Sequence, residues 1–276
     1  MGWSRRRALY VGGWLAVNAG LIGLWRWSPS SSLLPHDDGF TVGDVGAQEA
    51  VAFPVPERTA RLFQDGSRHL LDSGDLAIAS TKPAGVLRLP TGQLVAADPS
   101  WLPSARQLGI APYTVTVPPG SYPVALAMVS LPGEQRVAAA KLTIRDQPVT
   151  AWEMALRPGQ NPATLTAGQA FTVGVDSGTI AIFDGSVLDA AVRRSADDPR
   201  SFDLGENDST TASIDAASKA NLVAFRTGWG DGAYPAWIGR TANGAVGCFL
   251  FDMTMLAPQP GDTAAATPTP RSSPTG

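Results

Sequence analysis

The stretch from residue 170 to residue 194, AFTVGVDSGTIAIFDGSVLDAAVRR, decides the fold class. Apolar and β-branched residues fill 170–175 and 179–183, and the segment between them, Asp176–Gly178, is typical of a turn, so the pattern predicts two short strands. From Asp184, which can cap a helix, apolar residues recur at helical spacing. Short paired strands followed by a short helix indicate a mainly β fold.

The same alternation of short strands and turns continues in both directions from this stretch. The chain of 276 residues contains 29 glycines and 23 prolines, well above average usage for turn-forming residues. Further strands are expected at 75–80, 86–89, 93–97, 113–117, 122–129, 135–145, 149–156, 221–226, 234–238 and 245–251, and a second short helix at 209–220. Together these patterns predict a β-sandwich or partly open barrel of about ten short strands, with one or two short helices in the C-terminal half.

The N-terminal segment predicts where the protein is located. Residues 8–25, ALYVGGWLAVNAGLIGLW, are uncharged and follow three consecutive arginines. A helix of that length spans about 27 Å, close to the thickness of the hydrocarbon core. The arginine excess before the segment predicts a single-pass anchor with a cytoplasmic N-terminus and an extracytoplasmic body. The alternative is a cleaved signal peptide and a secreted protein.

Composition divides the chain into four regions. Residues 1–27 are the predicted membrane anchor or signal peptide, and 28–56, rich in Ser, Pro, Gly and Asp, are a predicted flexible spacer. A β-rich globular domain is expected over 57–256. Residues 257–276 contain five prolines and no large apolar residue, which predicts a disordered tail.

The scarcity of nitrogen and sulfur ligands excludes several classes of function. One cysteine cannot form an intrachain disulfide or a cysteine-based metal site, and two histidines cannot form a histidine-rich one. The first 30 residues contain four arginines and no acid, so the rest of the chain has a net charge of −7. Such an acidic body has no electrostatic footprint for nucleic acid. We therefore expect no nucleic-acid partner, no metal and no cofactor.

Four blocks of sequence resemble a known family. They are LRLPTGQLVAADP at 87–99, VPPGSYPV at 117–124, FTVGVDSGT at 171–179, and GWGDGAYP at 228–235 with Phe251-Asp252 after it. In this order and spacing they resemble an uncharacterised bacterial family, domain of unknown function 4241, over about residues 73–255. The resemblance implies a single domain and carries no established activity. The predicted anchor and tail are departures from the soluble form expected of that family.

The same blocks supply the candidate binding residues, which are five aspartates beside turns and one tyrosine: Asp98, Asp176, Asp184, Asp231, Tyr234 and Asp252. Converging carboxylates could bind a hard cation such as calcium, and a pair could act as acid and base in glycoside hydrolysis. Aspartates beside turns more often accept hydrogen bonds from local amides, and this structural role is the favoured interpretation.

Two function classes follow from these observations. The leading hypothesis is a non-enzymatic binding or structural module held outside the cytoplasmic membrane, with an envelope component as partner or with self-association through the anchor. The alternative is a carboxylate-based envelope hydrolase. It requires two of the aspartates at 98, 176, 231 and 252 to share a cleft with an exposed aromatic ring.

Overall fold

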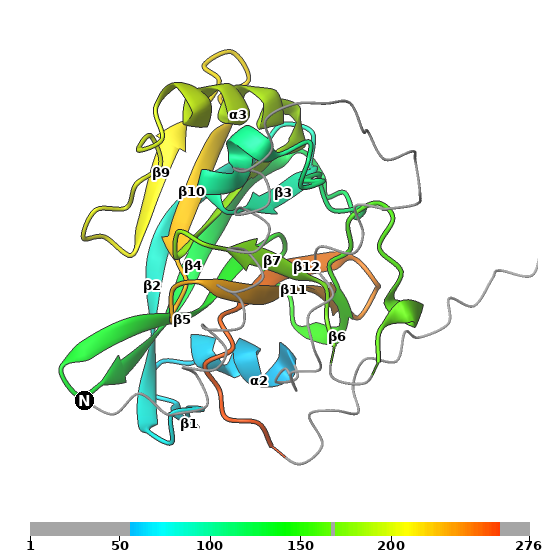
Figure 1. Ribbon diagram of the computed structural model, residues 1–276. Coiled ribbons are helices and arrows are strands. Elements are labelled where there is room, and N and C mark those ends of the chain that lie inside the picture. Colours follow the sequence, from blue (N-terminus) through cyan, green and yellow to red (C-terminus); the bar gives the residue numbers. More distant parts are fainter. Residues whose placement is uncertain (1–55, 167–168, 260–276) are drawn as a thin grey trace, which may run out of the picture. The chain divides into compact units, whose positions relative to one another are not determined.

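The computed structural model describes residues 56–166 and 169–259, which form twelve strands and few short helices (Figure 1). Strands make up 46% and helices 15% of the structure, so the predicted mainly β fold is confirmed. The predicted anchor, the predicted spacer up to residue 55 and the tail beyond residue 259 lie outside the described residues. None of the helices that the structure describes has the length and apolar character needed to cross a bilayer.

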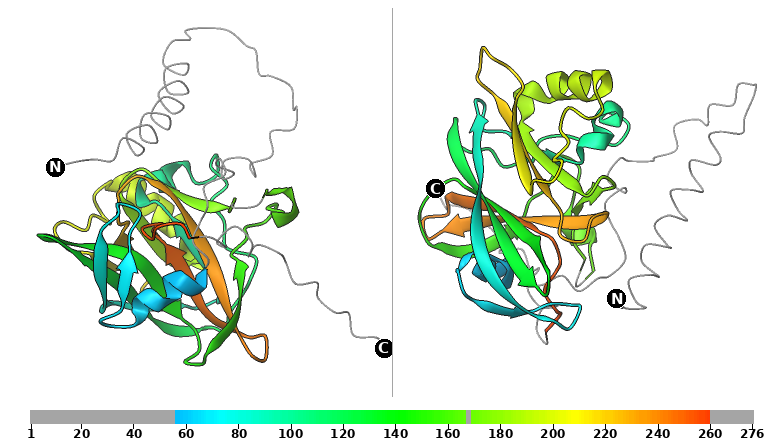
Figure 2. Two further views of the ribbon diagram at one scale, coloured as in Figure 1. Left: turned by 90° about the horizontal axis from the view of Figure 1, so that it is seen from below. Right: turned by 90° about the vertical axis from the view of Figure 1, so that its left-hand side faces the viewer.

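Eight of the described strands form one antiparallel sheet that curls into a half-barrel (Figure 2). In spatial order they are β1 (Arg68–Leu70), β2 (Leu76–Leu89), β4 (Gly120–Leu131), β5 (Glu134–Thr143), β12 (Val246–Asp252), β11 (Gly232–Thr241) and β6 (Val149–Met154). The eighth strand, β7 (Thr172–Val175), pairs with the first part of β11. Apolar side chains on the inner face of this sheet, including Phe249 and Phe251, form the larger core.

A second, four-stranded antiparallel sheet forms a middle layer. Its order is β3 (Leu94–Ala97), β8 (Thr179–Asp184), β10 (Asn221–Arg226) and β9 (Ser209–Ser213). Because side chains alternate between the faces of a strand, Ile180 and Ile182 of β8 join the core of the large sheet, whereas Ala181 and Phe183 join a second core. Burial on both faces explains why residues 180–183 of β8 are all apolar.

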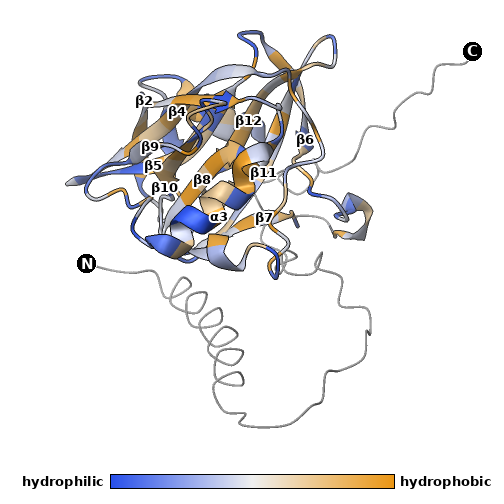
Figure 3. Cartoon of the chain, turned by 90° about the horizontal axis from the view of Figure 1, so that it is seen from above, coloured by the Kyte–Doolittle hydropathy of each residue, from blue (hydrophilic) through white to orange (hydrophobic). Residues whose placement is uncertain are grey.

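The second core is covered by α3 (Leu188–Asp197) and the 3₁₀ helix η3 (Pro99–Ser104). Figure 3 shows α3 crossing in front of β8 and carrying hydrophilic residues. The remaining short helices of the described regions are α2 (Pro56–Ala60), η2 (Arg61–Phe63), η4 (Pro162–Thr164) and η5 (Gly185–Val187).

The long strand β2 joins the two sheets. The Lys82 ammonium lies 2.7 Å from the Asp208 carboxylate, and the backbone amide of Arg88 donates to Asn221 Oδ1 at 2.7 Å. At Gly85, where φ is +119°, an added Cβ would lie 2.7 Å from Thr211 Oγ1 of β9. Glycine therefore permits both the backbone bend and the close approach of the small sheet.

Two predicted elements are wrong. Residues 113–117 form no strand, and only Thr116 among them makes an isolated β-bridge, with Gln93. Residues 209–220 form no helix: 209–213 are strand β9, and the chain then turns back into β10. The turn is closed by the amides of Ile214 and Asp215, which both donate to the carbonyl of Ala220, and by Ser218, which donates to the Asp215 carboxylate. Serine and aspartate occur both in hairpin loops and as helix caps, and in this segment they stabilise a hairpin loop.

Candidate functional site

Asp98 lies at the centre of the site, at the end of β3 and at the start of η3. Its side chain is fully buried and both carboxylate oxygens accept hydrogen bonds. Oδ1 accepts from the amide and the hydroxyl of Ser100 and from the hydroxyl of Ser177, each at 2.7 Å. Oδ2 accepts from the amides of Asp176 and Ser177 at 2.6 and 2.7 Å. Asp98 therefore fixes the turn between β7 and β8 against η3.

Two further aspartates face solvent beside this turn. Asp176 is part of the turn itself, and Asp231 lies in the loop between β10 and β11; both are exposed. Desolvation, followed by the negative charges of Asp176 and Asp98, raises the pKa of the Asp231 carboxyl. The structure thus brings three of the predicted aspartates into electrostatic contact, and the buried one holds the turn of Asp176 through its backbone amide.

The glycine-rich loop that carries Asp231 is held tightly against the same turn. The amide of Thr227 donates to the carbonyl of Gly178 at 3.0 Å, and a Cβ at Gly178 would lie 3.4 Å from the Cα of Gly230. The carbonyl of Gly230 accepts from the Thr227 hydroxyl at 2.6 Å and from the Tyr234 hydroxyl at 2.7 Å. Tyr234 is only 2% exposed. Tyr234 therefore holds the Asp231 loop in place through the hydrogen bond from its buried hydroxyl.

Two side chains that the sequence analysis did not select complete the site. The Arg136 guanidinium lies 4.7 Å from the centre of the half-buried Trp229 ring and donates to the Gly228 carbonyl at 2.9 Å. Trp101 of η3 lies against β7, where a Cβ at Gly174 would be 2.6 Å from its ring. Arg136 also donates to the carboxylate of Glu134 on the same strand, at 2.9 Å. Its contact with the site has no local sequence signal, because the Gly228 carbonyl is 92 residues away. The glycine inside a strand pattern at 174 was a signal for close approach by another group.

The candidate site therefore unites segments from three of the four sequence blocks: 97–101, 174–178 and 227–234. A family model described as a protein of unknown function (DUF4241) matches residues 87–251, which is more than half of the chain. The chain belongs to the DUF4241 family. No curated protein and no solved structure matches it.

The two other predicted aspartates of this DUF4241 domain occupy separate places. Asp184, at the opposite end of β8, is fully buried and caps η5. Its carboxylate accepts from the amide and hydroxyl of Thr91 (3.0 and 2.7 Å) and from the amide and hydroxyl of Ser186 (2.9 and 2.5 Å). Burial alone would raise the pKa of Asp184, but the hydrogen bonds from Ser186 and Thr91 outweigh it and lower the pKa.

Asp252, at the end of β12, is also fully buried, against α2. It accepts one hydrogen bond from the Thr59 hydroxyl at 2.6 Å and one from the Thr254 amide at 2.7 Å. Burial raises the pKa of its carboxyl to about 6, and the two hydrogen bonds and the charge of Arg58 oppose this effect. Asp184 and Asp252 therefore stabilise local structure in the DUF4241 domain and are not brought to the site around Asp98.

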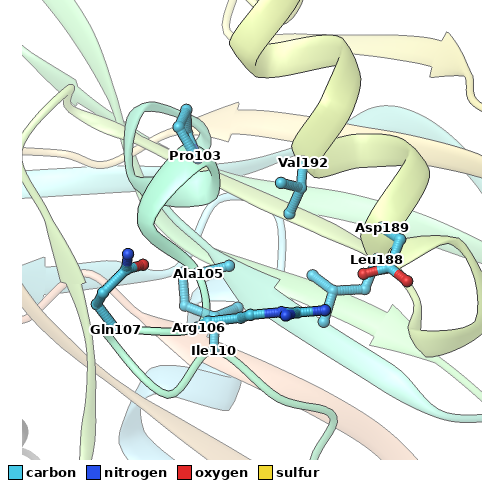
Figure 4. A pocket seen from close by; sticks show the side chains of 8 residues that line it. All are labelled: Pro103, Ala105, Arg106, Gln107, Ile110, Leu188, Asp189 and Val192. Carbon is cyan, nitrogen blue, oxygen red and sulfur yellow. The ribbon is translucent and has the colours of Figure 1, made fainter.

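The described residues contain no group of three or more His, Cys, Asp or Glu side chains that could hold a metal ion. A small hollow lies between η3 and α3, lined by Pro103, Ala105, Arg106, Gln107, Ile110, Leu188, Asp189 and Val192 (Figure 4). Its volume of about 90 Å³ is small compared with the roughly 300 Å³ at which ligand pockets begin. It contains none of the predicted site residues, and Figure 4 shows the Arg106 side chain reaching across it toward Leu188 and Asp189.

Proposed function

We propose that the protein is a membrane-anchored, extracytoplasmic module that binds a component of the cell envelope. The binding role is supported by the pair of exposed carboxylates, Asp176 and Asp231, on two loops that hydrogen bonds hold in place. Asp98 holds the turn of Asp176, and the loop of Asp231 is bonded to that turn through the Thr227 amide and the Gly178 carbonyl. A surface whose charged groups are fixed in advance loses little conformational entropy when it binds. The anchor is supported by the uncharged segment 8–25 and the arginines before it.

The acidic pair and the half-buried indole of Trp229 favour a polar partner that carries hydroxyl or ammonium groups. Peptidoglycan offers both, because its sugars carry hydroxyls and its peptides carry free amines. The partner class that we propose is therefore a cell-wall glycopeptide. Binding to it should weaken at high salt, since exposed charges are screened.

The test of binding is cosedimentation of the full chain, in mild detergent, with purified peptidoglycan. The variant Asp176→Asn/Asp231→Asn removes both exposed charges, and Asp197→Asn/Asp203→Asn is the matched control, because those two aspartates are exposed elsewhere. We expect the wild type and the control to sediment and the site variant to remain in solution. Equal sedimentation of all three proteins would refute the proposed site, and no sedimentation of the wild type would refute the proposed partner.

A carboxylate hydrolase is the second candidate, and one observation favours it. The pKa of the Asp231 carboxyl is raised, first by desolvation and then by the charges of Asp176 and Asp98, and a raised pKa is the property that a glycosidase gives to its general acid. Asp98 cannot take part, because it is fully buried and both its oxygens accept hydrogen bonds. Release of soluble reducing sugars in the same peptidoglycan incubations, abolished by Asp231→Asn, would establish the hydrolase. If no reducing sugars are released from the peptidoglycan, the hydrolase hypothesis is refuted.

The anchor has an independent test. In a cell that produces the full chain, we expect membrane fractions to contain it, and external protease to digest the domain in spheroplasts. The purified protein should retain its N-terminal residues. A soluble exported form that begins after Trp27 would instead show cleavage of a signal peptide.

A further inference from the structure

The hairpin of β1 and β2 presents an exposed aliphatic surface. Leu70, Leu76 and Ile78 are 48%, 62% and 49% exposed. Leu70 pairs directly with Leu76, and Arg68 pairs with Ile78, so all four side chains project from the same side of the hairpin. We call these four residues the hairpin face. Large aliphatic side chains gathered in this way on an exposed surface mark a contact with an apolar partner.

The hairpin face lies where the chain enters and leaves the described structure. The description begins at Pro56, and the following η2 contacts the hairpin through the Ser67 hydroxyl, which donates to the carbonyl of Arg61 at 3.2 Å. Near the other end, the amide of Ala257 donates to the carbonyl of Leu70 at 3.0 Å. Figure 1 shows α2 and β1 together at one end of the long strand β2.

We propose that the hairpin face rests on the surface of the phospholipid bilayer in which residues 8–25 are anchored. This inference rests on the proposed membrane anchor. The 55 residues that precede the described structure contain the predicted span, and they lead into α2 and then into η2, which contacts the hairpin. The hairpin therefore belongs to the part of the domain into which the predicted spacer leads.

The charges around the hairpin determine the depth of the contact. Arg61 and Arg68 are exposed and can donate to lipid phosphates, while the three aliphatic side chains reach the boundary between headgroups and acyl chains. The turn at the tip of the hairpin carries exposed Asp72 and Asp75, and the Asp75 carboxylate accepts from the Ser73 hydroxyl at 2.9 Å. Two acids at the tip oppose insertion of the tip, so the hairpin lies on the bilayer by its face.

Site-specific fluorescent labelling of the full chain tests this orientation. In a Cys248→Ala background, a polarity-sensitive dye is attached at Leu76→Cys or at Val86→Cys. Both residues belong to β2 and are well exposed, at 62% and 49%, but they are ten residues and thus about 30 Å apart along the strand. The proteins are reconstituted in vesicles of phosphatidylethanolamine and phosphatidylglycerol with and without a headgroup-attached spin-label quencher.

We expect the spin-labelled lipid to quench the dye at position 76 and to leave the dye at position 86 unquenched. Equal quenching at both positions, or at neither, overturns the proposal. A blue-shifted dye at 76 without lipid quenching also overturns it, because protein, such as a second copy of the chain, then covers the hairpin face. Flotation of the vesicles reports the anchor separately: protein that does not float refutes the anchor and the membrane contact together, whereas floating protein without quenching refutes only the contact.

Discussion

Replacing Asp252 by asparagine should remove a large part of the pH dependence of folding. The Asp252 carboxyl is fully buried between β12 and α2, and burial raises its pKa from 3.8 to about 6. The folded state therefore holds the proton more tightly than the unfolded state does. The resulting stabilisation is complete below pH 4 and is lost as the pH rises through 6.

The size of this effect follows from the shift. One pKa unit corresponds to about 1.4 kcal/mol, so a shift from 3.8 to about 6 is equivalent to about 3 kcal/mol of unfolding free energy. The introduced asparagine cannot ionise, and its amide can still accept from the Thr254 backbone and donate to the Thr59 hydroxyl. The unfolding free energy of Asp252→Asn minus that of the wild type should accordingly rise by about 3 kcal/mol between pH 4 and pH 8.

Urea denaturation of both proteins, followed by tryptophan fluorescence across this pH range, measures that difference. Burial, followed by the charges of Arg58 and Arg61, lowers the pKa of His69, but the titration of His69 is common to both proteins and cancels in the comparison. Asp197→Asn, which removes a carboxyl from an exposed position, is the control. A pH-independent difference for Asp252→Asn, or one that grows toward acid, would refute the assignment of a raised pKa to this buried carboxyl.

Three further substitutions test other parts of the structure. Gly174→Ala should destabilise the domain by about 1–3 kcal/mol in urea melts, because the new Cβ would lie 2.6 Å from the Trp101 ring. Gly133→Ala is its control: the new Cβ meets nothing within 4 Å, so the substitution should cost only about 1 kcal/mol, from the strain of a positive φ. Asp98→Ala should cost about 3 kcal/mol or more in the same assay, since it leaves five donors without their buried acceptor; a loss under about 1 kcal/mol would contradict its organising role. Tyr113→Phe should leave the melting temperature unchanged or raised, because the buried hydroxyl has no hydrogen-bond partner in the described part of the chain, and a clear loss of stability would show that it has one.

Periodicity predicted the parts of the fold that local interactions determine. The strands on either side of Asp176–Gly178 and the helix after Asp184 occur close to where the pattern placed them, since alternation and capping are properties of neighbouring residues. The segment 209–220 was assigned wrongly, because Ser209–Ser213 become a strand only by pairing with β10. The order of strands in the two sheets depends on contacts between distant residues, and no local pattern contains it.

The candidate site was predictable to a similar extent. Asp98, Asp176 and Asp231 were identified because each lies beside a predicted turn. That the three come together depends on how β3, β7 and β11 are arranged in the sheets. Arg136 and Trp101 were not identified, because each is placed by a partner far away in the sequence. The family match adds no activity to the residues of this site.

The buried aspartates show why a motif alone does not determine chemistry. Asp184 and Asp252 are each the last residue of a β-strand and are both fully buried, yet their pKa values move in opposite directions. Four donated hydrogen bonds stabilise the charged form of Asp184, whereas Asp252 receives two and its burial dominates. Both carboxylate oxygens of Asp98 accept from donors of the protein itself. Of the five predicted aspartates, Asp176 and Asp231 are the two whose side chains are exposed to a partner. The function of this domain is therefore to be sought on the surface that these two residues share.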